Sequence, residues 1–184
     1  MTYLDRALQR WRIRKAARYI PRNSRLLDIG TADGALFRAI SGLSESVGID
    51  MDIDSEDLPK QAHLTFFQGK FPDALPSPCT FDAITMLATL EHIPSSELGP
   101  LAANCSQYLR VGGRLIITVP SPFVDEILAV LQRLHLIHGM AVEQHYGFDV
   151  RTTPSIFTPH SFKLIVHHRF QLGLNNLFVF ERVA

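Results

Sequence analysis

The stretch LLDIGTADGALF (Leu26–Phe37) decides the fold of this chain. It begins inside a compact apolar run, RLLDI (Arg25–Ile29), which follows the turn-forming PRNS and predicts a buried strand. After a turn with two glycines, GALFRAISGL (Gly34–Leu43) has apolar residues at helical spacing. Strand, glycine turn and helix are typical of the first unit of an open α/β sheet. Ligands of such sheets bind at the carboxyl ends of the strands, so this turn is the expected site.

The turn lacks the glycine spacing of a dinucleotide-binding loop. Such a loop has the pattern GxGxxG, whose second glycine lets a pyrophosphate approach the backbone and the helix N-terminus. Here Ala32 holds the second glycine position, and Asp33 would place a negative charge beside the phosphate. Like charges close together in a partly buried cleft repel each other. We therefore expect a ligand that is neutral or has a cationic end.

Four further apolar runs have the length of strands. They are SVGID (Ser46–Asp50), HLTFFQ (His63–Gln68), FDAITML (Phe81–Leu87) and RLIITV (Arg114–Val119). A helix, SELGPLAANCSQYL (Ser96–Leu109), is predicted before the last of them and is ended by the turn VGG. Near-continuous apolar strands separated by helices indicate a parallel sheet that is covered on both faces.

The end of the chain predicts a different arrangement. PHSFKLIV (Pro159–Val166) is interpreted as a helix, and HHRFQLGL and NNLFVFERV as two strands joined by a tight turn at Asn175-Asn176. A link this short permits an antiparallel pair but not a parallel one. The predicted fold class is therefore α/β: a Rossmann-like three-layer sandwich with a mostly parallel seven-stranded sheet and an antiparallel C-terminal edge hairpin.

Composition excludes several classes of partner. Lys plus Arg and Asp plus Glu are both 18, so the formal net charge is zero and offers no electrostatic case for nucleic acid or an anionic membrane. The basic cluster RWRIRKAARYIPR (Arg10–Arg22) is interpreted as the solvated face of a helix. Two cysteines, no apolar leader and no apolar run of membrane-helix length favour a cytoplasmic protein.

Asp50 is the last residue of the second predicted strand. It lies 20 residues after Gly30 (50 − 30 = 20), where a carboxylate can accept hydrogen bonds from both hydroxyls of a ribose. A simple strand-terminal turn is the alternative role for this residue. Together with the glycine turn, Asp50 favours an adenosine ligand without choosing among adenosine cofactors.

Four segments in sequence order now resemble one known family. LLDIGTADG, VGIDMD, FDAITMLATLEHIP and LRVGGRLIITVPSP, from about Arg25 to Pro122, resemble the successive motifs of class I S-adenosylmethionine-dependent methyltransferases. The closing LGLNNLFVFER is similar to the antiparallel last strands of that fold. The implied cofactor is S-adenosylmethionine, whose methionine part carries an ammonium, a carboxylate and a sulfonium but no phosphate. That charge pattern agrees with the ligand expected from the turn.

The resemblance implies a set of cofactor-binding residues. Asp28 would hold the ammonium side, Gly30 and Gly34 would let the backbone approach the methionine part, and Asp50 would take the ribose diol. The N-terminus of the helix after the turn would favour the methionine carboxylate. The other implied contacts are Thr31, Ala32, Asp33, Met51, Gln68, Gly69 and Leu87. Met51 could pack on the adenine face or simply fill the core.

Lys70 departs from the family pattern. An acid is frequent at this position after the third strand, where it meets the adenine amino group, but a lysine cannot accept a hydrogen bond. Gln68, a backbone carbonyl or Asp73 would have to take over that contact.

Leu87, Ala88 and Thr89 follow the fourth strand and are expected, by the same resemblance, to face the transferring methyl group. The pair Glu91-His92 resembles one found in small-molecule methyltransferases, so His92 is the candidate catalytic base, because its pKa lies near neutrality. The alternative is that the pair only shapes the loop before the next helix.

The sequence thus predicts one domain, residues 1–184, with an N-terminal helix at 1–24 and a substrate-side insertion at 123–153. Its predicted function is methyl transfer from S-adenosylmethionine to a small molecule, without a metal; His138, Glu143 and His145 are interpreted as polar residues of a lid rather than metal ligands. A non-catalytic scaffold and an NAD(P)-dependent oxidoreductase are the rival functions. The acceptor, the methylated atom and the oligomeric state are left open.

Overall fold

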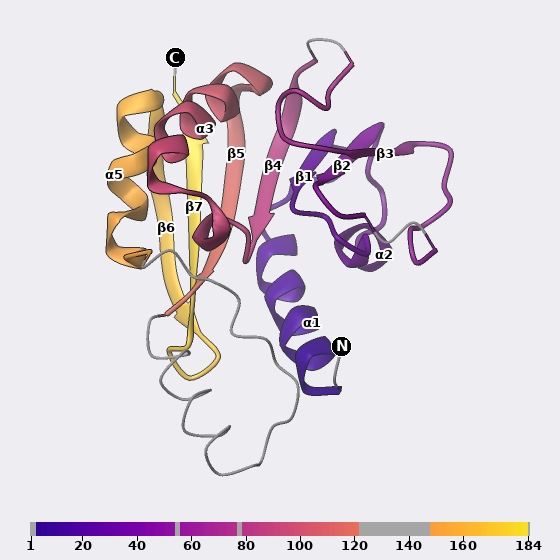
Figure 1. Cartoon of the computed structure of the whole chain (residues 1–184), viewed down its shortest axis with the longest axis horizontal. Helices are drawn as coiled ribbons and strands as arrows, with labels where there is room; N and C mark the ends of the chain where they lie inside the picture. Colours follow the sequence, from indigo (N-terminus) through magenta and orange to yellow (C-terminus); the bar gives the residue numbers. More distant parts are fainter. Residues whose placement is uncertain (1–2, 54–55, 77–78, 122–147, 184) are drawn as a thin grey trace.

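The computed structural model describes residues 3–53, 56–76, 79–121 and 148–183 (Figure 1). Its helices and strands are α1 (Tyr3–Ala17), β1 (Leu26–Ile29), α2 (Ala35–Ala39), β2 (Ser46–Asp50), β3 (Leu64–Gln68), β4 (Phe81–Leu87), α3 (Ser95–Tyr108), β5 (Leu109–Pro120), α5 (Thr153–Phe157), β6 (Phe162–Phe170) and β7 (Asn175–Arg182). Short 3-10 helices are η1 (Leu90–His92), η2 (Val150–Thr152) and η3 (Thr158–His160).

The strands form one seven-stranded sheet in the order β3-β2-β1-β4-β5-β7-β6. β1 to β5 run parallel to one another, while β7 pairs antiparallel with both β5 and β6. The order reverses at β1, which lies between β2 and β4, so the topological switch point falls at the glycine turn after β1. The predicted α/β fold and its antiparallel C-terminal edge are confirmed.

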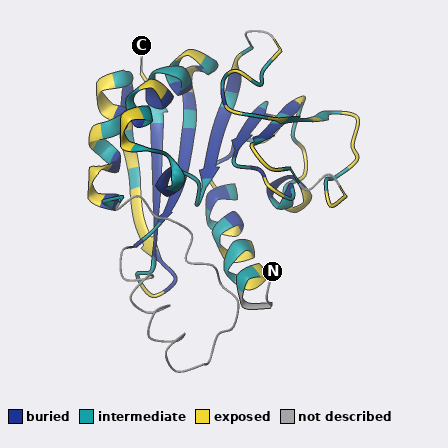
Figure 2. Cartoon of the chain, in the orientation of Figure 1, coloured by how far each residue is buried: buried dark blue, intermediate teal, exposed yellow. Residues whose placement is uncertain are grey.

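Helices cover both faces of the sheet, and alternate residues of each strand supply two cores. On one face Leu27 of β1 and Ile84 of β4 pack in a cluster with residues of α3 and α5; on the other face Leu26 and Ala83 pack with residues of α1 and α2. This period of two is the geometry of a strand that is buried on both sides. β1, β4 and β7 are accordingly almost wholly buried, whereas the edge strand β6 and the outer surfaces of α3 and α5 are exposed (Figure 2).

The predicted helix Pro159–Val166 is wrong. The chain turns through η3 and then enters β6, which extends from Phe162 to Phe170 and pairs with β7 along its length. Phe162, Leu164 and Val166 alternate with exposed residues, as expected for an edge strand with only one covered face. The period of two was the correct pattern, and the helix lies just upstream, in α5.

Two boundaries also differ from the prediction. α2 has only five residues and ends at Ala39, well before Leu43. β5 begins at Leu109 and continues through the glycines that were expected to form a turn, with a register shift against β4 between Phe81 and Ala83. Gly112 and Gly113 lie inside this register shift, between the paired residues Leu109 and Arg114.

The predicted N-terminal helix, 1–24, is present as Tyr3–Ala17. Most of the predicted insertion at 123–153, with His138, Glu143 and His145, lies outside the described residues. Among the helices that the structure describes, none has the length and apolar character needed to cross a membrane.

Candidate functional site

A cleft of about 1310 Å³ opens at the carboxyl ends of the parallel strands and extends beneath α1. Of the residues predicted from the sequence, Asp28, Gly30, Thr31, Ala32, Asp33, Asp50, Met51, Gly69, Leu87 and His92 all line it. Gly34 and Gln68 are not among its lining residues. We call the part formed by the segments after β1, β2 and β3 the loop half. The part formed by α1, η1, the turn between β6 and β7 and the start of β7 is the helix half.

Asp28 is the most deeply placed ionisable group of the loop half. It is 3% exposed, and its Oδ1 accepts a hydrogen bond of 2.7 Å from the Thr85 hydroxyl. Burial raises the pKa of Asp28 to about 6. The nearby hydroxyl groups of Thr85 and Thr31 oppose the rise, and the charges of Asp50 and Asp33 add to it. A cation bound beside Asp28 would favour its ionised form.

The glycine turn is clamped onto the end of β2. Gly30 and Thr31 donate backbone hydrogen bonds to the Ile49 carbonyl, and the Asp50 carboxylate accepts one of 2.8 Å from the Ala32 N–H. The other oxygen of Asp50 accepts from the backbone of Asp52 at 3.0 Å. Since a carboxylate has about four lone-pair sites, these two bonds leave room for the hydroxyls of a ribose.

Gly30 is required at its position. Its φ is +83°, and a Cβ there would lie 2.2 Å from the Thr89 hydroxyl oxygen. That hydroxyl donates to the Ile29 carbonyl at 3.2 Å and so ties the exit of β4 to the end of β1. Only glycine allows this close approach.

Asp33 has a structural role in addition to its place at the cleft. Its carboxylate forms a 2.6 Å ion pair with Arg38 and accepts a hydrogen bond from the Ala35 N–H at the start of α2. The N-terminus of this one-turn helix therefore already holds an anion. The expected contribution of the helix N-terminus to binding a ligand carboxylate is correspondingly small.

At the far end of the loop half, Met51 is 66% exposed and lines the cleft, so it does not fill the core. The Gln68 amide donates to the Met51 carbonyl at 3.2 Å and holds that backbone in place. Lys70 turns to Glu97 of α3, with 2.7 Å between Nζ and Oε2. Asp73 lines the cleft and is the remaining side chain among those expected to replace the usual acid.

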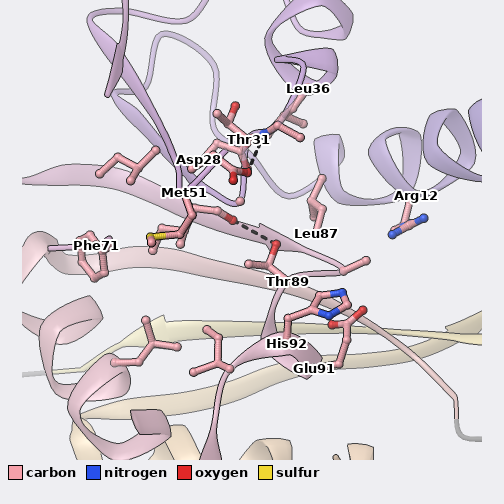
Figure 3. Close-up of a pocket in the computed structure, with 18 of the residues that line it drawn as sticks. Arg12, Asp28, Thr31, Leu36, Met51, Phe71, Leu87, Thr89, Glu91 and His92 are labelled. Carbon is pink, nitrogen blue, oxygen red and sulfur yellow. Dashed lines mark hydrogen bonds between the residues drawn. The ribbon is translucent and has the colours of Figure 1, made fainter. Parts of the chain in front are cut away.

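The exit of β4 leads into the helix half. Leu87, Ala88 and Thr89 line the cleft, as expected from the sequence, and η1 then presents His92. Glu91 is only 3% exposed, and its negative charge raises the pKa of Arg12. Burial of the Arg12 guanidinium has the larger effect, so the pKa of Arg12 is lowered overall. Figure 3 shows Arg12 beyond Leu87, on the side away from Asp28 and Met51.

α1 contributes one whole face to the cleft, whose individual residues were not singled out from the sequence. The face comprises Asp5, Leu8, Gln9, Arg12 and Ile13. Their spacing of three and four residues marks one side of a helix, so this signal was present in the sequence. Arg12 was instead assigned to a solvated basic face. Gln171 and Asn175 were also missed, because the predicted turn at Asn175-Asn176 is in fact formed by the preceding Gln171–Leu174 segment.

The charges of the loop half fit one kind of adenosine ligand better than another. Three carboxylates lie around the glycine turn after β1, those of Asp28, Asp33 and Asp50. Their negative charge disfavours a pyrophosphate and suits a ligand with an ammonium or sulfonium. The cleft exceeds the ~300–1,000 Å³ of an ordinary small-molecule pocket and can hold a nucleoside together with a second small molecule. Within the described ranges, no group of three or more His, Cys, Asp or Glu side chains could hold a metal ion.

Comparisons with known proteins agree with this geometry. A family model described as a methyltransferase domain matches residues 2–176. The fold is similar to the methyltransferase in a complex with the Haloferax volcanii Trm112 methyltransferase activator (TM-score 0.73, 12% identity, covering 96% of this chain and 91% of that one). It is also similar to a TehB-like SAM-dependent methyltransferase from Corynebacterium glutamicum (TM-score 0.67, 16% identity, covering 97% of this chain and 97% of that one). The N-methyltransferase NodS from Bradyrhizobium japonicum is similar as well (TM-score 0.63, 16% identity, covering 98% of this chain and 97% of that one). No curated protein matches in sequence.

Proposed function

We propose that this chain, which belongs to the methyltransferase domain family, transfers the methyl group of S-adenosylmethionine to a small-molecule acceptor. The observation that carries the proposal is the group of three carboxylates around the Gly30 turn, with Asp28 buried at its centre and Asp50 at the end of β2. This arrangement is suited to an adenosine ligand with a cationic amino-acid part.

Each residue of the loop half then has a defined task. Asp28 orients the ammonium, the backbone at Gly30 approaches the methionine part, and Asp50 accepts from the ribose hydroxyls. Met51 and Gly69 border the adenine. When bound, the cofactor would supply an activated methyl group. Transfer of this group to a lone pair of the acceptor would break its bond to sulfur, leave S-adenosylhomocysteine and release a proton from the acceptor.

His92 is proposed to take that proton. It lines the cleft from η1, directly after the β4 exit that borders the reacting group, and its side chain is half-buried. A base is useful only for a hydroxyl or a protonated acceptor, because alignment is the main requirement of the displacement. The prediction is that His92→Gln keeps the affinity for S-adenosylhomocysteine and lowers the turnover of such an acceptor.

The cofactor assignment is tested by calorimetric titration with S-adenosylhomocysteine and, separately, with NADH. We expect the first to bind and the second not to bind; the reverse result would overturn the proposal in favour of an oxidoreductase. Asp50→Ala should weaken S-adenosylhomocysteine by ~1–3 kcal/mol, the range for a lost charge-assisted hydrogen bond. Because Asp50 also holds the Ala32 and Asp52 backbone, Asp50→Asn, which keeps one acceptor oxygen, is the matched variant.

A non-catalytic scaffold is the second candidate function, and the Lys70 departure is the observation that favours it. It predicts that S-adenosylhomocysteine binds but that no acceptor is methylated. Incubating the protein with tritiated S-adenosylmethionine and a broad metabolite extract, then looking for label in small molecules, separates the two. Nucleic acid and membrane lipid serve as comparison acceptors, and we expect no label in either.

A further inference from the structure

The β7 end of the helix half lies away from the loop half of the cleft. The sheet order places β4, β5 and β7 successively away from β1, and β7 begins at Asn175, opposite Pro120 at the end of β5. With ~4.8 Å between neighbouring strands, Asn175 is about 14 Å across the sheet from β1. Asn175 and Pro120 both line the cleft, so this part of it offers space for a second molecule.

A chain of hydrogen bonds fixes the orientation of the Asn175 amide. The Gln171 Nε2 donates to the Leu8 carbonyl of α1 at 3.0 Å, and the Asn175 Nδ2 donates to the Gln171 Oε1 at 2.8 Å. A backbone carbonyl can only accept, so Gln171 must direct its NH₂ to Leu8 and its oxygen to Asn175. Asn175 must then direct its own NH₂ to Gln171.

This orientation leaves the Asn175 Oδ1 without a partner. The residue is 8% exposed, and its Oδ1 is buried with no hydrogen bond from any described residue. An unsatisfied buried carbonyl costs ~1–3 kcal/mol. A hydroxyl or amine of a bound molecule would remove that cost, whereas a carboxylate would be repelled by it.

Arg12 has a buried donor that lacks an acceptor among the described residues. The residue lies one helical turn from Leu8 on the same face of α1. Its Nε is buried and has no hydrogen-bond partner in the described part of the chain. Glu91 attracts the guanidinium, yet desolvation outweighs that attraction and lowers the pKa of Arg12. The Arg12 Nε–H is therefore a buried donor that an anionic group of a bound molecule could satisfy.

We propose that Arg12 and Asn175 form the acceptor subsite, and that the acceptor is a small carboxylic acid bearing a hydroxyl or amino group. Arg12 binds the carboxylate and the Asn175 Oδ1 accepts from the hydroxyl or amine. A single guanidinium beside Glu91 suits a singly charged carboxylate better than a phosphate dianion. The inference rests on the proposed function, because it assigns the second molecule of the same cleft.

The test uses the full chain, titrated with and without saturating S-adenosylhomocysteine. The probes are the ortho, meta and para isomers of hydroxybenzoate, the matching hydroxybenzamides, and benzoate. We expect at least one hydroxybenzoate to bind about tenfold more tightly than both its amide and benzoate. Arg12→Gln should remove the preference for the acid over the amide, and Asn175→Ala the preference for hydroxybenzoate over benzoate.

Arg14→Gln is the matched control, since Arg14 is exposed on the same helix and does not line the cleft. It should leave every affinity unchanged. Arg12→Lys keeps the positive charge but loses the planar guanidinium, so it should retain part of the preference for the acid. It replaces Arg12→Gln in the test if the Gln variant does not fold.

Three results would overturn the inference. One is the absence of any preference for an acid over its amide in the unsubstituted protein. Another is an acid preference that survives in Arg12→Gln. The third is a tenfold or greater loss of S-adenosylhomocysteine affinity in Arg12→Gln, which would assign Arg12 to the methionine carboxylate instead. A protein that binds no S-adenosylhomocysteine but retains the Arg12-dependent acid preference would contradict the proposed function and leave the carboxylate subsite standing.

Discussion

The loop half and the helix half of the cleft are formed by different kinds of structure. The loop half consists of short segments that directly follow β1, β2 and β3, with glycines and carboxylates held by backbone hydrogen bonds. The helix half consists of long side chains that α1, η1 and the start of β7 bring together. One half is thus specified by local sequence, and the other by the tertiary fold.

This difference explains which site residues could be predicted. Asp28, Gly30 and Asp50 have positions in local motifs, each at the end of a recognisable strand, and all three line the cleft. Arg12 and Asn175 lie 163 residues apart (175 − 12 = 163), and nothing local marks either of them as a partner of the other. If the two halves differ in this way, substitutions in the loop half should change the stability of the backbone and the affinity for the cofactor.

The largest effect is expected from Gly30→Ala. Its φ of +83° is unfavourable for alanine, and its Cβ would meet the Thr89 side chain. We expect the free energy of unfolding to fall by ~2–5 kcal/mol, the sum of the two penalties. Denaturant titration measures this value. Gly173→Ala is the control, because Gly173 has a φ of +86° with no atom nearby; an equal loss there would show that the Thr89 contact is unimportant.

Asp28→Asn should change stability and binding in opposite directions. The pKa of Asp28 rises from 3.8 to about 6 on folding, so at pH 8 its ionised form disfavours the folded state by up to ~3 kcal/mol. Asparagine removes that cost, and the free energy of unfolding should increase by up to this amount. The gain should shrink as the pH falls through 6 and vanish near pH 4. S-adenosylhomocysteine affinity should fall by ~1–3 kcal/mol.

The pH dependence of binding provides a smaller and independent test. An ammonium next to Asp28 favours the carboxylate, so the pKa of Asp28 is lower in the complex than in the free protein, where it is about 6. S-adenosylhomocysteine affinity should therefore be constant from pH 8 to 6.5 and fall by up to tenfold per pH unit below 6. Calorimetry across this range should give a flat profile for Asp28→Asn. A sloping one would assign the proton to another group.

The smallest effect is expected from Lys70→Ala. Its ion pair with Glu97 is largely exposed on both sides, and such pairs contribute ~0–1 kcal/mol. We expect the melting temperature and the S-adenosylhomocysteine affinity to change little. A marked loss of affinity would show that Lys70 contacts the cofactor after all, and that the loop half depends on a long side chain as the helix half does.

In the fold, as in the site, the parts specified by local sequence were predicted and those that depend on tertiary contacts were not. Strands β1, β2 and β4 match their predicted positions within one residue, because their apolar runs are continuous and both faces are buried. β6 was misassigned as a helix followed by a shorter strand, because an edge strand has only one covered face and its apolar period is weak over FKLIVHHRF. β5 continues through Gly112 and Gly113 because Leu109 and Arg114, on either side of them, both pair with β4, and no local pattern contains that pairing.

The hydrogen bond from Gln171 to the Leu8 carbonyl has a consequence for the order in which the protein is made. It joins residues 163 positions apart, whereas β1 and β2 are in contact once about fifty residues exist. Contacts of long sequence separation form late, because a long loop must close first. During synthesis the loop half can assemble well before β7 emerges from the ribosome. The nascent chain therefore passes through a stage in which the loop half is formed and the helix half is still incomplete.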